Sequence, residues 1–257
     1  PKIFELTLFN GVDMRTGKQL GLQTGNAEDF ETFEELWDAF AKQIKHFADI
    51  KVKGSNTILQ IFAKYMPAPF LSVVTDDCIA KGKDYNAGGA RYNVTYIQGV
   101  GIGTISDCLA AVKYNVYDHK KFTMAELLQA LKDNFVGHED IHNLVCNKTP
   151  KYGNDDDYAD DLMKRVFYLY QEEITDRPNM KGGTWRVDML PTTCHVYFGD
   201  VMIASANGRL AHKPVSEGIS PEKGADVNGP TAVIKSCAKM DHLKTGGTLL
   251  NQKFLPE

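Results

Sequence analysis

An acidic run holds the densest group of side chains that could bind a metal ion. Residues 154–161 read NDDDYADD, with five aspartates and one asparagine in eight positions. A calcium-binding loop between two helices needs an oxygen ligand where Ala159 stands and a glycine near it, and this run has neither. Aspartates are also favoured where a helix begins, because the helix dipole is positive there. The run therefore predicts the start of a helix, and no metal site is expected.

The cysteines and histidines do not combine into a catalytic or metal site. The five cysteines are dispersed without a C-x-x-C pair, which argues against a disulfide framework and a structural zinc site. Asp76 and Asp77 precede Cys78, but the sequence places no base beside them. Cys194 and His195 are neighbours in LPTTCHVYF, which we interpret as a strand whose successive side chains point to opposite faces. No catalytic residue is predicted.

The same segment contains the two candidates for ligand binding. In a strand, Leu190, Thr192 and Cys194 lie on one face, and the residues between them lie on the other. If that face lines a cavity, the hydroxyl of Thr192 orients a small polar ligand. We therefore treat this segment as a candidate ligand-binding strand.

A glycine-rich run raises the question of phosphate binding. Residues 88–104 read GGARYNVTYIQGVGIGT, and Gly99, Gly101 and Gly103 give G-x-G-x-G rather than the dinucleotide pattern G-x-G-x-x-G. No Gly-Lys-Ser/Thr follows, so the Walker pattern fails too. Glycines also let a backbone approach closely packed neighbours, because they carry no Cβ. We favour this packing role in a strand–loop–helix unit.

Composition excludes several classes of protein. The chain has 257 residues, 43% of them hydrophobic, and a formal net charge of −4. This is enough for one large or two modest cores. The charge favours neither nucleic acid nor an anionic membrane as a partner. No apolar run approaches the roughly 20 residues of a membrane-spanning helix, and no signal peptide is recognisable. These features predict a cytoplasmic protein.

The elements that must position these residues alternate between helices and strands. Apolar spacing predicts helices over 29–47, about 56–66, 106–117, 123–135, 156–174 and about 232–240. Thr32 with Glu35, and Thr123 with Glu126, have capping-box spacing. Buried strands are predicted over 70–74, within 185–204, and at the end of the chain over 249–254. The fold class is α/β with parallel strands, in one unit without a domain boundary.

Longer motifs resemble a known family. KGKDYNAGGARYNVTYIQGVGIGT, TPKYGNDDDYAD, KPVSEGISPEKGADVNGPTAVIKS and KMDHLKTGGTLLNQKF are similar to the glycyl radical enzymes of the pyruvate formate-lyase superfamily. The resemblance covers essentially the whole chain. RVDMLPTTCHVYFG is most similar to the branch that dehydrates trans-4-hydroxy-L-proline. Enzymes acting on glycerol, propane-1,2-diol, choline or arylacetates are looser matches.

The resemblance implies a ten-stranded α/β barrel of which residues 1–257 form one part. An activating enzyme with S-adenosylmethionine and an iron–sulfur cluster would place a radical on a glycine, which would generate a cysteine thiyl. The Gly-Cys-Val-Glu motif of the thiyl and the R-V-x-G-Y motif of the glycine are both absent from the 257 residues. The resemblance thus implies a segment between the cysteine loop and the glycyl loop, inactive alone. The resemblance also implies that this segment itself binds no cofactor. Because MLPTT aligns with the family strand that faces substrate, the resemblance implies that Thr192 and Leu190 bind substrate, through a hydroxyl contact and an apolar wall.

Three functions remain open. The first is part of a hydroxyproline dehydratase that is a homo-oligomer, with the activating enzyme and a small-molecule substrate as its partners. The second is a glycyl radical enzyme for another small substrate, such as glycerol, propane-1,2-diol or choline. The third is a non-catalytic binding or assembly protein that reuses half of the barrel.

Overall fold

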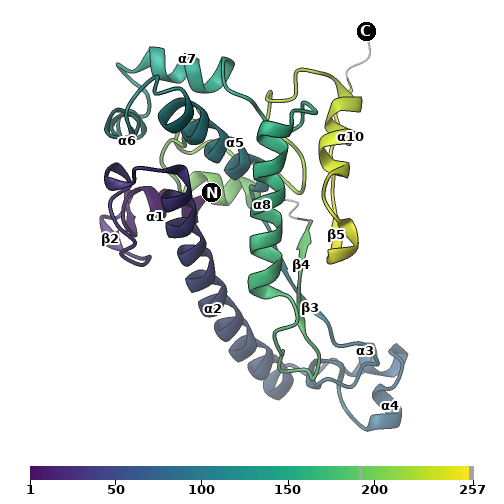
Figure 1. Ribbon diagram of the computed structural model, residues 1–257. Coiled ribbons are helices and arrows are strands. Elements are labelled where there is room, and N and C mark those ends of the chain that lie inside the picture. The colour runs from purple at the N-terminus through teal and green to yellow at the C-terminus, as the bar shows by residue number, and fades with distance from the viewer. Residues whose placement is uncertain (191–192, 255–257) are drawn as a thin grey trace.

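The chain is built around a three-stranded parallel sheet. The structure is a computed structural model that describes residues 1–190 and 193–254. The sheet order is β3-β4-β5, with bounds Thr95–Gln98, Trp185–Met189 and Thr245–Thr248. Both neighbouring pairs are parallel, as the sequence predicts. Figure 1 shows the sheet beside long helices, so the predicted α/β class is confirmed.

Two long helices cover one face of the sheet. Helix α2 spans Phe33–Tyr65 and helix α8 spans Asp157–Ile174. Thr32 and Glu35 form the predicted capping box of α2, and the Asp156 side chain accepts a hydrogen bond from the Tyr158 amide at the start of α8. The prediction of two helices over 29–47 and 56–66 is wrong. The helix continues through Gly54, which costs only about 1 kcal/mol in a helix interior.

Helix α5, Ile102–Val112, is the centre of the main hydrophobic core. Every residue of α5 is buried, and α5 packs along α8. It follows β3 through the turn at Gly99–Gly101, so the predicted strand–loop–helix unit is confirmed. The helix begins four residues before the predicted start at Ser106 and continues as a π-helical turn over Lys113–Asp118.

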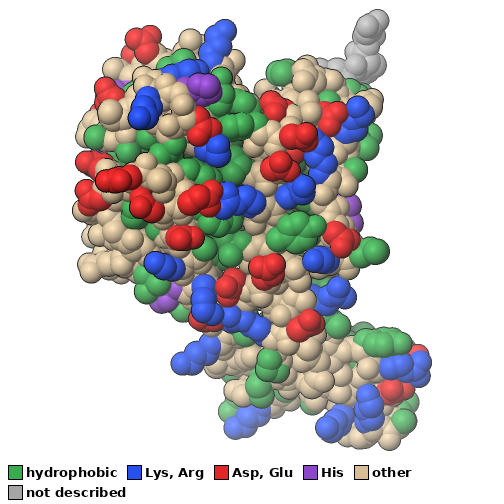
Figure 2. Space-filling view, in the orientation of Figure 1, with side chains coloured by type: hydrophobic (Ala, Val, Ile, Leu, Met, Phe, Trp, Pro, Cys, Tyr) green, Lys and Arg blue, Asp and Glu red, His purple; other side chains and the backbone are tan. Residues whose placement is uncertain are grey.

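A small lobe projects at the far end of α2 and carries the helices α3 and α4 (Figure 1), and it stands out from the rest of the molecule in the space-filling view (Figure 2). They span Pro69–Val74 and Cys78–Lys81. The prediction of a buried strand over 70–74 is wrong, because Pro69 at the first helical position favours a helix start. Phe70 is 91% exposed and Val74 is 79% exposed. The apolar composition of residues 70–74 was therefore not sufficient to predict that they are buried.

The remaining elements close the core at the other end of the sheet. They are α1 Lys2–Leu8, α6 Met124–Lys132, α7 Glu139–Asn147, α9 Cys194–Asp200, α10 Pro230–Ala238 and the short hairpin β1 Val12–Asp13 and β2 Lys18–Gln19. Thr123 and Glu126 form the second predicted capping box. Within residues 1–190 and 193–254, no helix is long and apolar enough to cross a membrane.

Two strand predictions near the end of the chain are wrong. Residues 194–200 form helix α9 instead of continuing the strand that ends at Met189. The last strand lies at Thr245–Thr248, and the apolar residues after it are outside the sheet. Phe254 is 69% exposed, so the described part of residues 249–254 is not the buried strand that its composition suggested.

Candidate functional site

The carboxyl ends of the three parallel strands meet at one edge of the sheet. Gln98 on β3 is in register with Asp188 on β4, and Met189 is in register with Thr248 on β5. A fourth segment extends this edge, because the Ile219 amide donates to the Leu249 carbonyl at 2.9 Å. Ligand sites of α/β proteins lie outside the carboxyl ends of their strands. This edge is therefore the candidate site.

The two faces of the sheet have different surroundings. Ile97, Trp185 and Val187 point toward α2 and α8, where they pack with Ala48, Val52 and Ile174. Side chains alternate along a strand, so Tyr96 and Asp188 point to the opposite face. Tyr96 is 42% exposed on that face, whereas Ile97, Trp185 and Val187 on the other face are buried. A second layer of polypeptide is needed to enclose this face.

Asp188 is the most unusual group on the open face. Its side chain is only 7% exposed, and its Oδ1 is buried without a hydrogen-bond partner among the described residues. Burial raises the pKa of the Asp188 carboxyl, because a charged carboxylate is poorly solvated there. A buried carboxylate without a partner is costly in a finished structure. Asp188 is therefore placed to receive a donor from a ligand or from another part of the polypeptide.

The glycine-rich run makes the carboxyl edge compact. A Cβ added to Gly99 would lie 2.5 Å from Met189 Sδ, and one added to Gly103 would lie 2.7 Å from the Ser220 carbonyl oxygen. At Gly101 the backbone φ is +74°, and a Cβ would come within 3.0 Å of Val215. Both β4 and the 215–220 segment thus pack directly on this turn. These contacts support the packing role that we predicted for the run.

An apolar cavity of about 220 Å³ lies beside this turn. Side chains from α2, α8 and α9 contribute to its wall, which includes Phe40, Val166, Tyr170, Phe198, Met202 and Val215. The Tyr170 hydroxyl donates to the Ile97 carbonyl at 2.9 Å and so fixes α8 on β3. The wall offers few polar groups, so the cavity suits apolar atoms better than a charged ligand.

The two predicted ligand-binding residues follow β4 directly. Leu190 is half-buried and contacts β5, because a Cβ added to Gly247 would lie 3.1 Å from Leu190 Cδ1. Thr192 lies outside the described residues. Their role in substrate binding stays a prediction.

Cys194 and His195 do not form a pair. They are consecutive residues of α9, where neighbouring side chains diverge by about 100°. His195 is buried and its Nδ1 has no hydrogen-bond partner among the described residues. The two side chains therefore share no site, as predicted. The reason given for that prediction was wrong, because the two residues lie in a helix and not in a strand.

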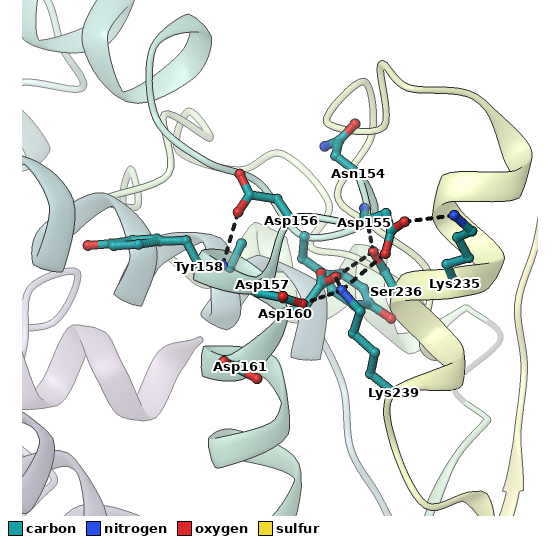
Figure 3. A network of polar contacts seen from close by, with 12 residues as sticks. Asn154, Asp155, Asp156, Asp157, Tyr158, Asp160, Asp161, Lys235, Ser236 and Lys239 are labelled. Atoms are coloured by element: carbon teal, nitrogen blue, oxygen red, sulfur yellow. Dashed lines mark hydrogen bonds and ion pairs between the residues drawn. The ribbon is translucent and has the colours of Figure 1, made fainter.

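The acidic run forms a network of ion pairs with α10 (Figure 3). The Nζ of Lys239 contacts three carboxylates: 2.6 Å to Asp160, 2.7 Å to Asp157 and 3.2 Å to Asp155. Ser236 donates to Asp160 at 2.8 Å and accepts from the Asp155 amide at 2.9 Å. No cluster of metal ligands occurs among residues 1–190 and 193–254. These aspartates begin α8, as predicted, and also hold α10 against it.

Comparison with known proteins assigns the chain to a family. The family model described as "Pyruvate formate lyase-like" matches residues 1–199, and the model described as "Glycine radical" matches residues 215–257. The chain therefore belongs to the pyruvate formate lyase-like family, as its motifs suggest.

Individual members of this family differ in how similar they are to the chain. The trans-4-hydroxy-L-proline dehydratase of Clostridioides difficile is 65% identical over 256 residues, which are all of this chain and 32% of that protein. The crystal structure of hydroxyproline dehydratase from the same organism, with trans-4-hydroxy-L-proline bound, matches 99% of this chain with a TM-score of 0.97. The glycerol-bound glycerol dehydratase of Clostridium butyricum is 39% identical, with a TM-score of 0.93 over 97% of this chain. This chain covers 32% of each of these two structures and therefore spans about a third of the relatives' length.

Sequence reasoning missed two residues of the site. Tyr96 and Asp188 lie on the open face, and neither was singled out. A signal was present in WRVDM, where charged residues alternate with apolar ones. In a strand this pattern places Arg186 and Asp188 on one face and predicts that this face is not packed against apolar helices.

Proposed function

We propose that the chain is one part of a glycyl radical enzyme that removes water from trans-4-hydroxy-L-proline to give 1-pyrroline-5-carboxylate. The observation that carries this proposal is the 65% identity, over the whole chain, to a protein with that activity. The second dehydratase structure, for glycerol, is less similar at 39% identity. Residues 1–257 would form part of a pyruvate formate-lyase-like barrel between the cysteine loop and the glycyl loop.

In this proposal the radical is supplied from outside the chain. A glycyl radical, installed by an activating enzyme that uses S-adenosylmethionine and an iron–sulfur cluster, would provide the hydrogen-atom abstraction. The activating enzyme is thus a proposed partner, and the cytoplasm is the proposed location of the reaction. The chain itself would hold no cofactor.

The residues of this chain would enclose the substrate and exclude water. Beside the carboxyl edge the glycine-rich run packs closely on β4 and on the 215–220 segment, and the neighbouring cavity is lined mainly by apolar side chains, which bind water poorly. Exclusion of water protects a reactive intermediate from side reactions. Leu190 would be an apolar wall against the pyrrolidine ring of the substrate, and the hydroxyl of Thr192 would hydrogen-bond the substrate. Asp188, with its unpartnered Oδ1, would face the enclosed interior.

The test is an anaerobic assay of the full-length protein with its activating enzyme. We expect 1-pyrroline-5-carboxylate from trans-4-hydroxy-L-proline and no turnover of glycerol, propane-1,2-diol or choline. The substitution Thr192→Val should raise KM, and Thr192→Ser, which keeps the hydroxyl, should restore it. Turnover of a diol without turnover of hydroxyproline would show that the substrate named in this proposal is wrong. Lack of any turnover, with a glycyl radical visible by electron paramagnetic resonance, would reject it.

A further inference from the structure

A second cavity lies outside the candidate site and is lined by cations. Its volume is about 500 Å³, and it lies between the end of α7, the 151–152 turn and the 207–225 loop. Its charged lining residues are Lys151, Lys213, Lys223, Arg209, Asp107 and Glu222. Because neither the sheet edge nor the apolar cavity shares these residues, this cavity is a separate feature.

The cations of this cavity lack acidic partners. Among the described residues, none of Lys151, Lys213 and Lys223 forms an ion pair within 4.0 Å. Lys151 donates to the Asn207 carbonyl at 2.8 Å, which fixes its ammonium group at the wall. Such an ammonium group has three donors, so two remain.

Arg209 adds a fixed positive charge below the wall. It is 7% exposed, and its guanidinium donates to the Ser205 hydroxyl at 3.0 Å and to the Ile203 and Lys213 carbonyls at 2.6 Å each. All of these acceptors are neutral, and the carboxylates of Glu222 and Glu5 act on Arg209 only through the electric field. A buried cation that no carboxylate contacts directly favours an anion nearby.

The two acids offset only part of this charge, because four cations line the same cavity. Asp107 is completely buried, and burial raises its pKa to about 7, so part of its carboxyl is neutral at physiological pH. Glu222 is already engaged, because its oxygens accept from the Thr104 hydroxyl and from the Lys223 amide. The groups that remain available to a ligand are mainly the lysine ammonium groups.

From this arrangement we propose that the cavity binds a small tetrahedral oxyanion of the phosphate class, held by Lys151, Lys213 and Lys223. Charge-assisted hydrogen bonds from ammonium groups to phosphate oxygens are among the stronger polar contacts in proteins. The volume also accommodates a small group attached to the phosphate. The ligand is therefore either free phosphate or the phosphate of a small metabolite. This inference does not depend on the proposed reaction.

Calorimetric titration of the full-length protein tests the proposal, with inorganic phosphate and glycerol 3-phosphate as separate probes at constant ionic strength. We expect saturable binding of one or both, and the tighter probe identifies the source of the phosphate. The triple substitution Lys151→Gln, Lys213→Gln and Lys223→Gln should weaken binding by about tenfold or more, the equivalent of one lost charge-assisted contact. Lys151→Arg, which keeps the charge, should bind as the native protein does.

The matched control removes the same charge elsewhere. Lys18→Gln, Lys42→Gln and Lys51→Gln change three exposed lysines that do not line the cavity. This control should bind phosphate normally. The proposal is overturned if neither probe binds saturably to the native protein, as when other polypeptide fills the cavity. It is equally overturned if both triple variants lose affinity to the same extent, which would indicate only a general effect of net charge.

Discussion

The ring of Tyr96 occupies the place that a Cβ of Gly246 would take. Tyr96 lies on β3 and Gly246 on β5, so the ring crosses the strand between them, β4, on the open face of the sheet. One aromatic side chain thus ties all three strands together at the face that carries Asp188. The glycine is required by this contact and not by its backbone, since its φ is outside the left-handed region.

This relationship predicts a thermodynamic cycle. Gly246→Ala in the full-length protein should destabilise the fold by about 1–3 kcal/mol, because the added methyl group forces the ring out of its place. In a Tyr96→Ala background the same substitution should cost much less. Chemical denaturation of the four proteins measures the coupling. Additive effects of the two substitutions would show that the ring is not the obstacle.

Gly101 should tolerate alanine less well than Gly17 does. Both have a left-handed φ, +74° and +68°, so both pay the same backbone strain of about 1 kcal/mol. Only Gly101 has neighbours where the Cβ would go, whereas Gly17 has nothing within 4 Å. Gly101→Ala should therefore lower the melting temperature more than Gly17→Ala.

A larger residue at Gly101 should affect folding more than substrate binding. Gly101→Val and Gly99→Val should reduce the yield of folded enzyme, since the glycine run packs on β4 and on the 215–220 segment. The measurement is soluble yield and thermal stability beside KM. Normal stability with a selectively raised KM would contradict the packing role.

Lys239 should contribute more to stability than Lys235, although both pair with Asp155. Lys239 also faces Asp160, whose side chain is fully buried, while the side chain of Lys235 is 62% exposed. Lys239→Met should cost about 3 kcal/mol, because it leaves a buried carboxylate without its cation. Lys235→Met should have a small effect, since exposed ion pairs contribute little. Urea denaturation of both variants separates these cases.

Asp107 should make stability fall as the pH rises. Burial raises the pKa of its carboxyl in the folded protein from the usual 3.8 to about 7, so between these pH values the unfolded chain has lost the proton that the folded chain keeps. Stability then decreases by up to about 1.4 kcal/mol per pH unit in that range.

The substitution Asp107→Asn tests this pH dependence. It removes the titration while keeping an acceptor for the Tyr152 amide, which now donates to Asp107 Oδ1 at 2.8 Å. Free energies of unfolding measured between pH 4 and 7 should therefore fall less steeply in the variant. Parallel curves for the two proteins would show that Asp107 does not titrate in this range.

The sequence by itself determined where those helices begin whose start is set by contacts between residues close together in the chain. The capping boxes at Thr32 and Thr123 and the acidic start of α8 depend on contacts three or four residues apart, and each of these helices begins within four residues of its predicted start. The same holds for the glycine run, because a missing Cβ is a property of the residue itself. The family resemblance was also readable, since long motifs keep their order along the chain.

Tertiary structure decided what depends on distant partners. Residues 70–74 and 194–200 are apolar enough for strands, but they form the helices α3 and α9 and pair with no strand among the described residues. Lys239 and Asp160 meet 79 positions apart, and Tyr96 reaches Gly246 only because β3, β4 and β5 lie side by side. Strand pairing, buried charge and side-chain overlap are set by contacts between distant segments, and no short stretch of sequence encodes them by itself.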